Sequence, residues 1–219
     1  MGVTVLVLGR SGSGKSCSLR NFEQGEVAVL NVTGKPMPFR KRLDVYSGAN
    51  GGGAGYPAIL QALAANRRRC YVVDDANYLM ANAQFARAKE PGYGKFVDMA
   101  SDFKAMLDMA ARTTRDTTVY VMMHPDFDAD GRMKPKTAGR MLDEKLCVEG
   151  LFPIVLVAER RDQGYVFVTQ TDGLTPAKTP MGMFDDELIV NDLRMVDDVI
   201  RDYYGLAPRT TGEEVEDVA

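Results

Sequence analysis

The sequence predicts an α/β protein built on one mostly parallel sheet with helices on both faces. Four short runs rich in aliphatic and β-branched residues, at residues 3–8, 26–32, 70–75 and 117–124, predict buried strands. Segments with helical spacing separate several of them, and strands that alternate with helices favour a parallel sheet. Two later strand-like runs, 151–160 and 164–173, are joined by the turn RDQG, which predicts an antiparallel hairpin extension.

The helices follow from the spacing of apolar residues. Residues 15–22 come directly after a glycine-rich turn and can open a helix, and residues 58–69 and 192–205 also have helical character. Residues 95–113 predict an amphipathic helix, because apolar side chains recur at intervals of three and four: Phe96, Met99, Phe103, Met106, Leu107 and Ala110. The proline-containing segment 35–42, the glycine-rich segment 47–57 and the polar segment 125–140 are expected to be loops.

Composition narrows the class of protein. A chain of 219 residues suits one domain, and its net charge of −3 means that any nucleic-acid binding needs a local basic patch. No apolar run reaches the roughly 18 residues of a membrane span, and the N-terminus lacks the flanks of a signal peptide. Three widely spaced cysteines argue against a disulfide framework or a zinc site and favour a reducing, cytoplasmic compartment. We expect one domain over residues 1–207 and an acidic, disordered tail over 208–219.

Residues 9–16, GRSGSGKS, fit the phosphate-binding pattern G-x-x-x-x-G-K-[ST], between a predicted strand and a predicted helix. Gly12 and Gly14 carry no side chain, so backbone N–H groups and the new helix N-terminus can face a polyphosphate. Lys15 neutralises phosphate oxygens, and the Ser16 hydroxyl can ligate Mg²⁺. The alternative is a glycine-rich turn with a chance lysine. The residues expected to contact the nucleotide are Gly9, Arg10, Ser11, Gly12, Ser13, Gly14, Lys15, Ser16 and Cys17.

Acidic residues and a histidine follow two of the predicted strands. We expect Asp74 to hold Mg²⁺ with Ser16, and Asp75 to orient or deprotonate a water molecule. The alternative for this pair is to cap the next helix. His124 is the only histidine and ends the fourth strand, where strand ends surround the ligand, so it can contact the γ-phosphate; the alternative is a structural histidine. Lys15, Asp75 and His124 are therefore the candidate catalytic residues, and the lack of a guanine-selective N-K-x-D motif favours ATP while leaving GTP open.

Several segments resemble the RecA-like ATPases, and in particular their short phage-encoded forms, which are the ATP-binding proteins of single-strand annealing and recombination modules. The segments span residues 9–204 and include GRSGSGKS, YVVDDANYLM, GYGKF, KTAGRMLDEKLCVEGLF, VTQTDGLTPAKTPMGMF and NDLRMVDDVIRDYY. The resemblance implies a RecA-like P-loop NTPase core that binds ATP and Mg²⁺ and acts in DNA recombination by annealing or strand exchange. It also implies single-stranded DNA, further copies of the chain and a phage single-strand-binding or annealing protein as partners, in the cytoplasm of a phage-infected bacterium.

In RecA-like proteins, two loops that follow the metal-binding strand and the sensor strand contact DNA. They correspond here to residues 80–95 and 125–140. The resemblance therefore implies that bases stack on Phe127 or Tyr93. It also implies DNA contacts for the cations of both loops, which are Arg87, Lys89, Lys95, Arg132, Lys134, Lys136 and Arg140. The alternative is that both are solvated lid segments, and three aspartates in the second loop oppose DNA binding.

The chain also departs from the family. RecA relatives carry a catalytic glutamate after the second strand, where this chain has Asn31 and Thr33. Either Asp75 substitutes for it, or hydrolysis is slow. Two other functions fit the same loop: a small-molecule kinase, for example of a nucleoside or nucleotide, and a nucleotide-gated assembly factor with little turnover.

Overall fold

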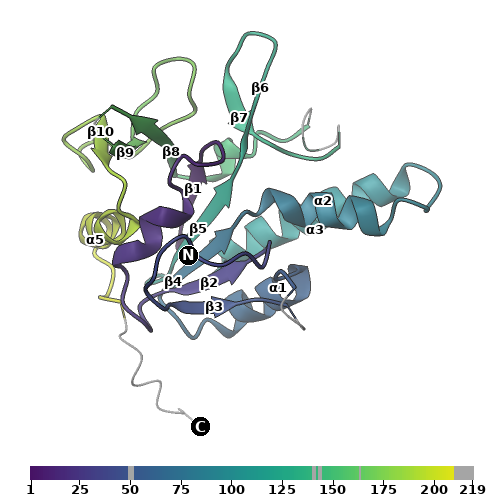
Figure 1. Cartoon of the computed structure of the whole chain (residues 1–219), viewed down its shortest axis with the longest axis horizontal. Coiled ribbons are helices and arrows are strands. Elements are labelled where there is room, and N and C mark those ends of the chain that lie inside the picture. The colour runs from purple at the N-terminus through teal and green to yellow at the C-terminus, as the bar shows by residue number, and fades with distance from the viewer. Residues whose placement is uncertain (49–51, 140–141, 143–144, 163, 210–219) are drawn as a thin grey trace.

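The structure is a computed structural model that describes residues 1–48, 52–139, 142, 145–162 and 164–209. Its central sheet has the strand order β10-β9-β8-β1-β5-β4-β2-β3 (Figure 1). The strands from β8 to β3 pair in parallel, whereas β9 and β10 extend the sheet in antiparallel fashion. The predicted α/β class, with a mostly parallel sheet and a late antiparallel hairpin, is therefore confirmed. The strands are β1 (Val3–Leu8), β2 (Ala28–Asn31), β3 (Asp44–Tyr46), β4 (Cys70–Asp74), β5 (Thr118–Met123), β8 (Ile154–Arg161), β9 (Gly164–Val168) and β10 (Leu188–Val190).

Helices cover both faces of the sheet. On one face, Leu6 and Leu8 of β1 pack with α1 (Tyr56–Ala65), α2 (Asn77–Ala86) and α3 (Gly94–Ala111). On the other face, Val5 and Val7 pack with η1 (Ser16–Asn21) and α5 (Leu193–Tyr204). All of β1 is buried, as its run of aliphatic and β-branched residues predicted. No helix in the described ranges is long and apolar enough to cross a membrane.

Two of the helical predictions need correction. The segment 80–95, which the family resemblance implied as a loop, is helical at both ends, because α2 continues to Ala86 and α3 begins at Gly94; residues 87–93 connect the two helices. Alanine and glutamine in ANAQFA are good helix formers, and they extend the helix past the point where the family resemblance implied a loop. The helix expected after the glycine-rich turn is a 3₁₀-helix of six residues, η1. On α3, Phe96 is only half-buried, while Met99 and Phe103 are buried as predicted.

Short strands were also missed. The segment 125–140, expected as a polar loop, contains an antiparallel pair, β6 (Pro125–Phe127) and β7 (Met133–Pro135), which projects beyond the end of the sheet (Figure 1). Strands β3 and β10, each of three residues, form the two edges of the sheet. Strands of three residues are too short to show an alternating pattern in the sequence. They are recognised only from the strands to which they hydrogen-bond.

Helix α5 lies against η1 and closes one face of the sheet. The helix begins at Asp192, whose carboxylate accepts a hydrogen bond from the backbone N–H of Arg194 at 3.0 Å. After the helix the chain turns back, and Arg209 donates a hydrogen bond to Asp197 at 2.7 Å. Residues 210–219 lie outside the described residues, so the division at residue 207 and the disordered tail stay predictions.

Candidate nucleotide-binding site

The glycine-rich turn links the buried end of β1 to η1. Gly12 and Gly14 have φ angles of +78° and +95°, a region that favours glycine. A Cβ atom on Gly14 would lie 2.8 Å from Cδ1 of Tyr165, so the packing also requires glycine there. The backbone of the turn therefore has the conformation that requires glycine at these two positions, as the phosphate-binding pattern predicts.

Lys15 is buried in this turn and points back across it. Its Nζ donates hydrogen bonds to the carbonyl oxygens of Gly9 at 2.6 Å and Arg10 at 3.2 Å. Burial lowers the pKa of Lys15, and the charges of Asp75 and Asp74 partly oppose this shift. The partners of the Lys15 ammonium in this confined turn are neutral carbonyl oxygens, so the turn attracts an anion. Because η1 is a short 3₁₀-helix, the attraction for an anion comes mainly from Lys15 and the turn.

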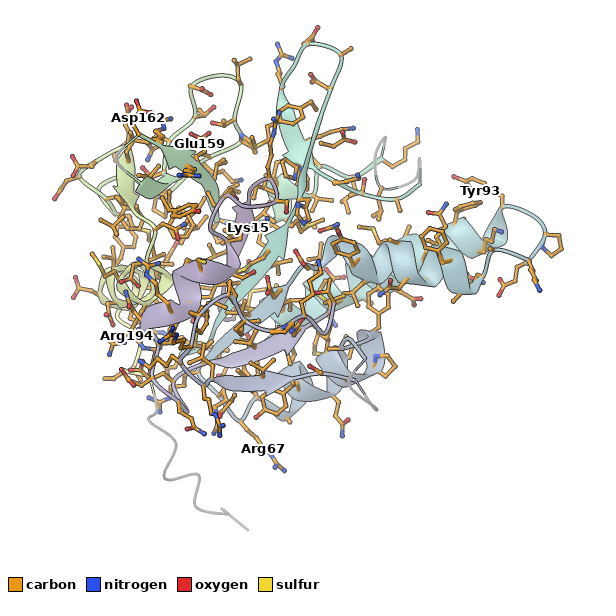
Figure 2. The ribbon with its side chains drawn as sticks, viewed as in Figure 1. Lys15, Arg67, Tyr93, Glu159, Asp162 and Arg194 are labelled. Atoms are coloured by element: carbon orange, nitrogen blue, oxygen red, sulfur yellow. The ribbon has the colours of Figure 1, made fainter. Side chains whose placement is uncertain are left out.

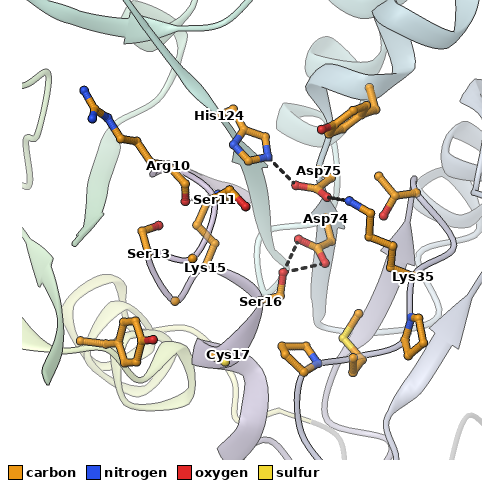
Figure 3. Close-up of a pocket in the computed structure, with 18 residues that line it drawn as sticks. Arg10, Ser11, Ser13, Lys15, Ser16, Cys17, Lys35, Asp74, Asp75 and His124 are labelled. Carbon is orange, nitrogen blue, oxygen red and sulfur yellow. Dashed lines mark hydrogen bonds and ion pairs between the residues drawn. The ribbon is translucent and has the colours of Figure 1, made fainter. Parts of the chain in front are cut away.

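Ser16 and Asp74 meet beside the turn. The Ser16 hydroxyl lies 3.1 and 3.0 Å from the two carboxylate oxygens of Asp74, at the end of β4 (Figure 3). Burial, together with the charge of Asp75, raises the pKa of Asp74 to about 6. These hard oxygen atoms fit Mg²⁺, and a cation would offset the cost of burying the carboxylate. Among the described residues no group of three or more His, Cys, Asp or Glu side chains is placed to hold a metal. Mg²⁺ here would therefore need further ligands from phosphates and water.

Asp75 and His124 form a second pair at the same end of the sheet. His124 Nε2 lies 3.3 Å from Asp75 Oδ1 (Figure 3). The strand order places β5 between β1 and β4, so His124 lies between the glycine-rich turn and the aspartates. Burial and the charge of Lys15 lower the pKa of His124, which favours a neutral imidazole at neutral pH. Asp75 has a φ angle of +60°, an uncommon conformation for a residue other than glycine.

The capping alternative for these aspartates receives no support. Helix α2 has Ala76 as its N-cap residue, and no side-chain cap is present among the residues that the structure describes there. The Asp74 carboxylate contacts Ser16, and the Asp75 carboxylate contacts His124 and Lys35. Both carboxylates therefore face the cavity.

A cavity of about 310 Å³ connects these groups (Figure 3). Predicted residues from Arg10 to Cys17 line it together with Asp74, Asp75 and His124, while Gly9 lies at the base of the turn and accepts the bond from Lys15. Three other segments contribute side chains to the cavity that were not predicted from the sequence: Lys35, Pro36, Met37, Pro38, Tyr78 and Tyr165. The segment after β2 was recognisable in principle, because parallel strands end at one edge of a sheet. Tyr165, from the antiparallel hairpin, gave no sequence signal.

The first group of expected DNA-contacting residues lies away from this cavity. Arg87 pairs with Glu90 at 2.7 Å and with Asp98 at 2.8 Å. Lys95 donates to backbone carbonyls, including that of Glu90 at 2.7 Å. Figure 2 shows Tyr93 at the far end of the α2–α3 pair, distant from Lys15. The expected DNA-contacting residue Lys89 lies in the same connection between α2 and α3.

The second group lies on the β6–β7 hairpin, next to the glycine-rich turn. The guanidinium of Arg10 stands 4.9 Å from the ring centroid of Phe127, so the hairpin and the turn are in contact. Lys134 is on β7 and Lys136 follows it, while Arg132 in the hairpin lies 3.5 Å from Asp130. Arg140 lies outside the described residues.

Comparison with known proteins adds no assignment. The sequence matches no protein-family model, and no curated protein matches it. The interpretation of the site therefore rests on its residues and their geometry.

Proposed function

We propose that this protein is a RecA-like P-loop ATPase that binds ATP with Mg²⁺, hydrolyses it, and uses this cycle to bind single-stranded DNA during annealing or strand exchange. One observation carries the proposal. Lys15, the Ser16–Asp74 pair and the Asp75–His124 pair surround a single cavity at the ends of three parallel strands. A phosphate-binding turn, hard metal ligands and a carboxylate held by a neighbouring imidazole are the groups that hydrolysis of a nucleoside triphosphate requires.

Each group has a distinct task in hydrolysis. Lys15 exchanges its carbonyl partners for phosphate oxygens. Ser16 and Asp74 would hold Mg²⁺, which would supply positive charge beside the phosphates. Asp75 orients the attacking water and accepts its proton, while His124 keeps the Asp75 carboxylate in place. The water oxygen bonds to the γ-phosphorus, and the bond from that phosphorus to the bridging oxygen breaks, leaving its electron pair on ADP.

The hairpin links this chemistry to DNA. β6 begins directly after His124, and the backbone N–H of Lys136 donates to the carbonyl oxygen of His124 at 2.9 Å. Phe127 on the hairpin is 39% exposed, and an exposed aromatic ring beside cations suits stacking on single-stranded bases. We place the DNA contact here because the hairpin touches the glycine-rich turn through Phe127 and Arg10, whereas the α2–α3 connection lies far from Lys15 (Figure 2).

The test is phosphate release from Mg-ATP, with and without a single-stranded oligonucleotide, at two salt concentrations. We expect release that the oligonucleotide stimulates, and stimulation that fades as salt rises. Lys15→Ala should abolish nucleotide binding, and unchanged ATP affinity in that variant would refute the phosphate site. Turnover that requires an added nucleoside acceptor would favour a kinase, and nucleotide-dependent oligomers without DNA affinity would favour an assembly factor.

A further inference from the structure

The turn after β2 lies at the place where RecA-like proteins carry a catalytic glutamate. β2 ends at Asn31, whose Cα is paired in register with that of Asp74. The Asn31 carboxamide is buried and is used within the turn. Its Nδ2 donates to the carbonyl of Lys35 at 2.7 Å, and its Oδ1 accepts from the backbone N–H of Gly34 at 3.0 Å. Asn31 is neutral and engaged in these bonds, so it is a structural element of the turn rather than a base.

This turn directs Lys35 into the cavity. Lys35 Nζ lies 3.9 Å from Asp75 Oδ2 and 5.4 Å from the ring centroid of Tyr78 (Figure 3). Gly34, with a φ angle of +68°, permits the reversal that presents Lys35, and the bond from Asn31 fixes its backbone. The Lys35 side chain is 68% exposed, unlike buried Lys15, so its ammonium is available to a ligand in the cavity.

The position of Lys35 has an electrostatic consequence. The Asp75 carboxylate has His124 on one oxygen and Lys35 near the other. Lys35 and Lys15 both line the cavity, so two cations face it from the segments that follow β2 and β1. A cation beside the residue that orients water therefore lies close to the place where the γ-phosphate would react.

We propose that Lys35 is a catalytic residue that contacts the γ-phosphate during hydrolysis and stabilises the charge of the transition state. The inference rests on the proposed ATPase function and deepens it. In place of an acid after the second strand, the chain presents a cation from the same molecule, and Asp75 keeps the task of accepting the proton of water. The bonds formed and broken are those of the hydrolysis described above, because Lys35 stabilises charge and transfers no group.

The test compares Lys35→Ala and Lys35→Arg with Lys104→Ala. Lys104 is a suitable control, because it pairs with Asp108 on α3 at 2.6 Å and does not line the cavity. Three quantities are measured in each variant: kcat for phosphate release from Mg-ATP, the Kd of ATP, and the Kd of ADP with aluminium fluoride, which mimics the transferring phosphoryl group. Thermal unfolding checks that each variant is folded.

We expect kcat of Lys35→Ala to fall about 100-fold. The Kd of ATP should change by less than about threefold, and the affinity for ADP with aluminium fluoride should fall in parallel with kcat, because the contact strengthens in the transition state. Lys35→Arg should keep part of the activity, and Lys104→Ala should match the wild type.

Two outcomes overturn the inference, and they can be told apart. If the wild type hydrolyses ATP and Lys35→Ala has an unchanged kcat, or loses ATP affinity in proportion to activity, then Lys35 has no role specific to the transition state and the ATPase proposal stands. If the wild type binds Mg-ATP but releases no phosphate, the proposed hydrolysis and the role of Lys35 both fail.

Discussion

The substitution Asp197→Asn tests whether a buried charge cluster anchors α5 to the sheet. Asp197 is fully buried, and its Oδ1 accepts hydrogen bonds from the hydroxyls of Thr118 at 2.6 Å and Tyr120 at 2.8 Å. Its Oδ2 accepts from Arg201 Nε at 2.6 Å and Arg209 Nη1 at 2.7 Å. An asparagine of the same shape removes the charge and places an amide donor or a neutral oxygen against two guanidinium groups.

The expected loss in the free energy of unfolding depends on which charged groups lose their partner. Breaking a buried ion pair by removing one partner costs about 3–5 kcal/mol. Arg201 keeps hydrogen bonds to the carbonyls of Arg69, Asp116 and Ala207, which lowers the penalty toward the smaller value. We therefore expect a loss of about 3 kcal/mol in the free energy of unfolding. For a chain of this size that corresponds to a fall in Tm of roughly 6–12 °C.

The neighbouring Asp198→Asn is the matched control. The Asp198 side chain is 54% exposed and pairs with Arg209 at 2.6 Å, so its loss should cost about 0–1 kcal/mol. Urea denaturation followed by circular dichroism measures both variants, together with the dependence of the free energy on urea. A loss for Asp197→Asn within about 1 kcal/mol of the control would refute the reasoning, because the cluster would then contribute no more than a surface pair.

Three further predictions follow from other contacts. Burial raises the pKa of Glu26, but hydrogen bonds from Arg194 and the Glu23 backbone, with the charge of Arg209, outweigh it and bring the pKa to about 2, below the ordinary 4.5. The stability that Glu26 contributes is therefore complete above pH 4.5 and is lost as the pH falls toward 2. Urea denaturation should show that the difference in free energy of unfolding between wild type and Glu26→Gln shrinks over that pH window. A difference that does not change with pH would contradict this prediction. Gly12→Ala should lower the stability of the nucleotide-free protein by about 1 kcal/mol, because Gly12 has a positive φ angle although a Cβ there would have no atom within 4 Å. Gly14→Ala should lower it by about 2 kcal/mol or more, because its Cβ would also meet Tyr165. Equal losses of stability in thermal unfolding would argue against the contact with Tyr165. Phe127→Ala should weaken binding of a fluorescent single-stranded oligonucleotide about tenfold while DNA-free phosphate release stays unchanged, and Phe127→Trp should restore the affinity; unchanged affinity in the alanine variant would move the DNA contact elsewhere.

The fold class and part of the site were predictable because their signals are local. The apolar runs of β1, β4 and β5 are long enough to mark buried strands, and the phosphate-binding pattern lies in one contiguous stretch. Parallel strands end at one edge of a sheet, which is why Asp74 and His124 were expected beside the turn. The β6–β7 hairpin was missed because strands of three residues depend on pairing rather than on their own pattern.

The rest of the site depends on tertiary structure, which brings together residues that are distant in the sequence. Tyr165 reaches Gly14 because the antiparallel hairpin folds β9 back beside β8, and no spacing in the sequence encodes that approach. Lys35 belongs to a segment whose prolines predicted only a loop, and its direction is fixed by the buried carboxamide of Asn31. The sequence therefore shows that no acid directly follows β2, but not which side chain the turn directs into the cavity.

The conformation of Asp75 explains how two adjacent carboxylates take different partners. In an ordinary strand, successive side chains point to opposite faces, and the second would leave the cavity. A φ angle of +60° at Asp75 ends the strand abruptly, so Asp74 contacts Ser16 while Asp75 contacts His124 and Lys35. This conformation costs roughly 1–3 kcal/mol for a residue other than glycine, and such strain persists where the surroundings hold it in place. Contacts to His124 and Lys35 supply that support, which ties the strained backbone to the same residues that the proposed hydrolysis uses.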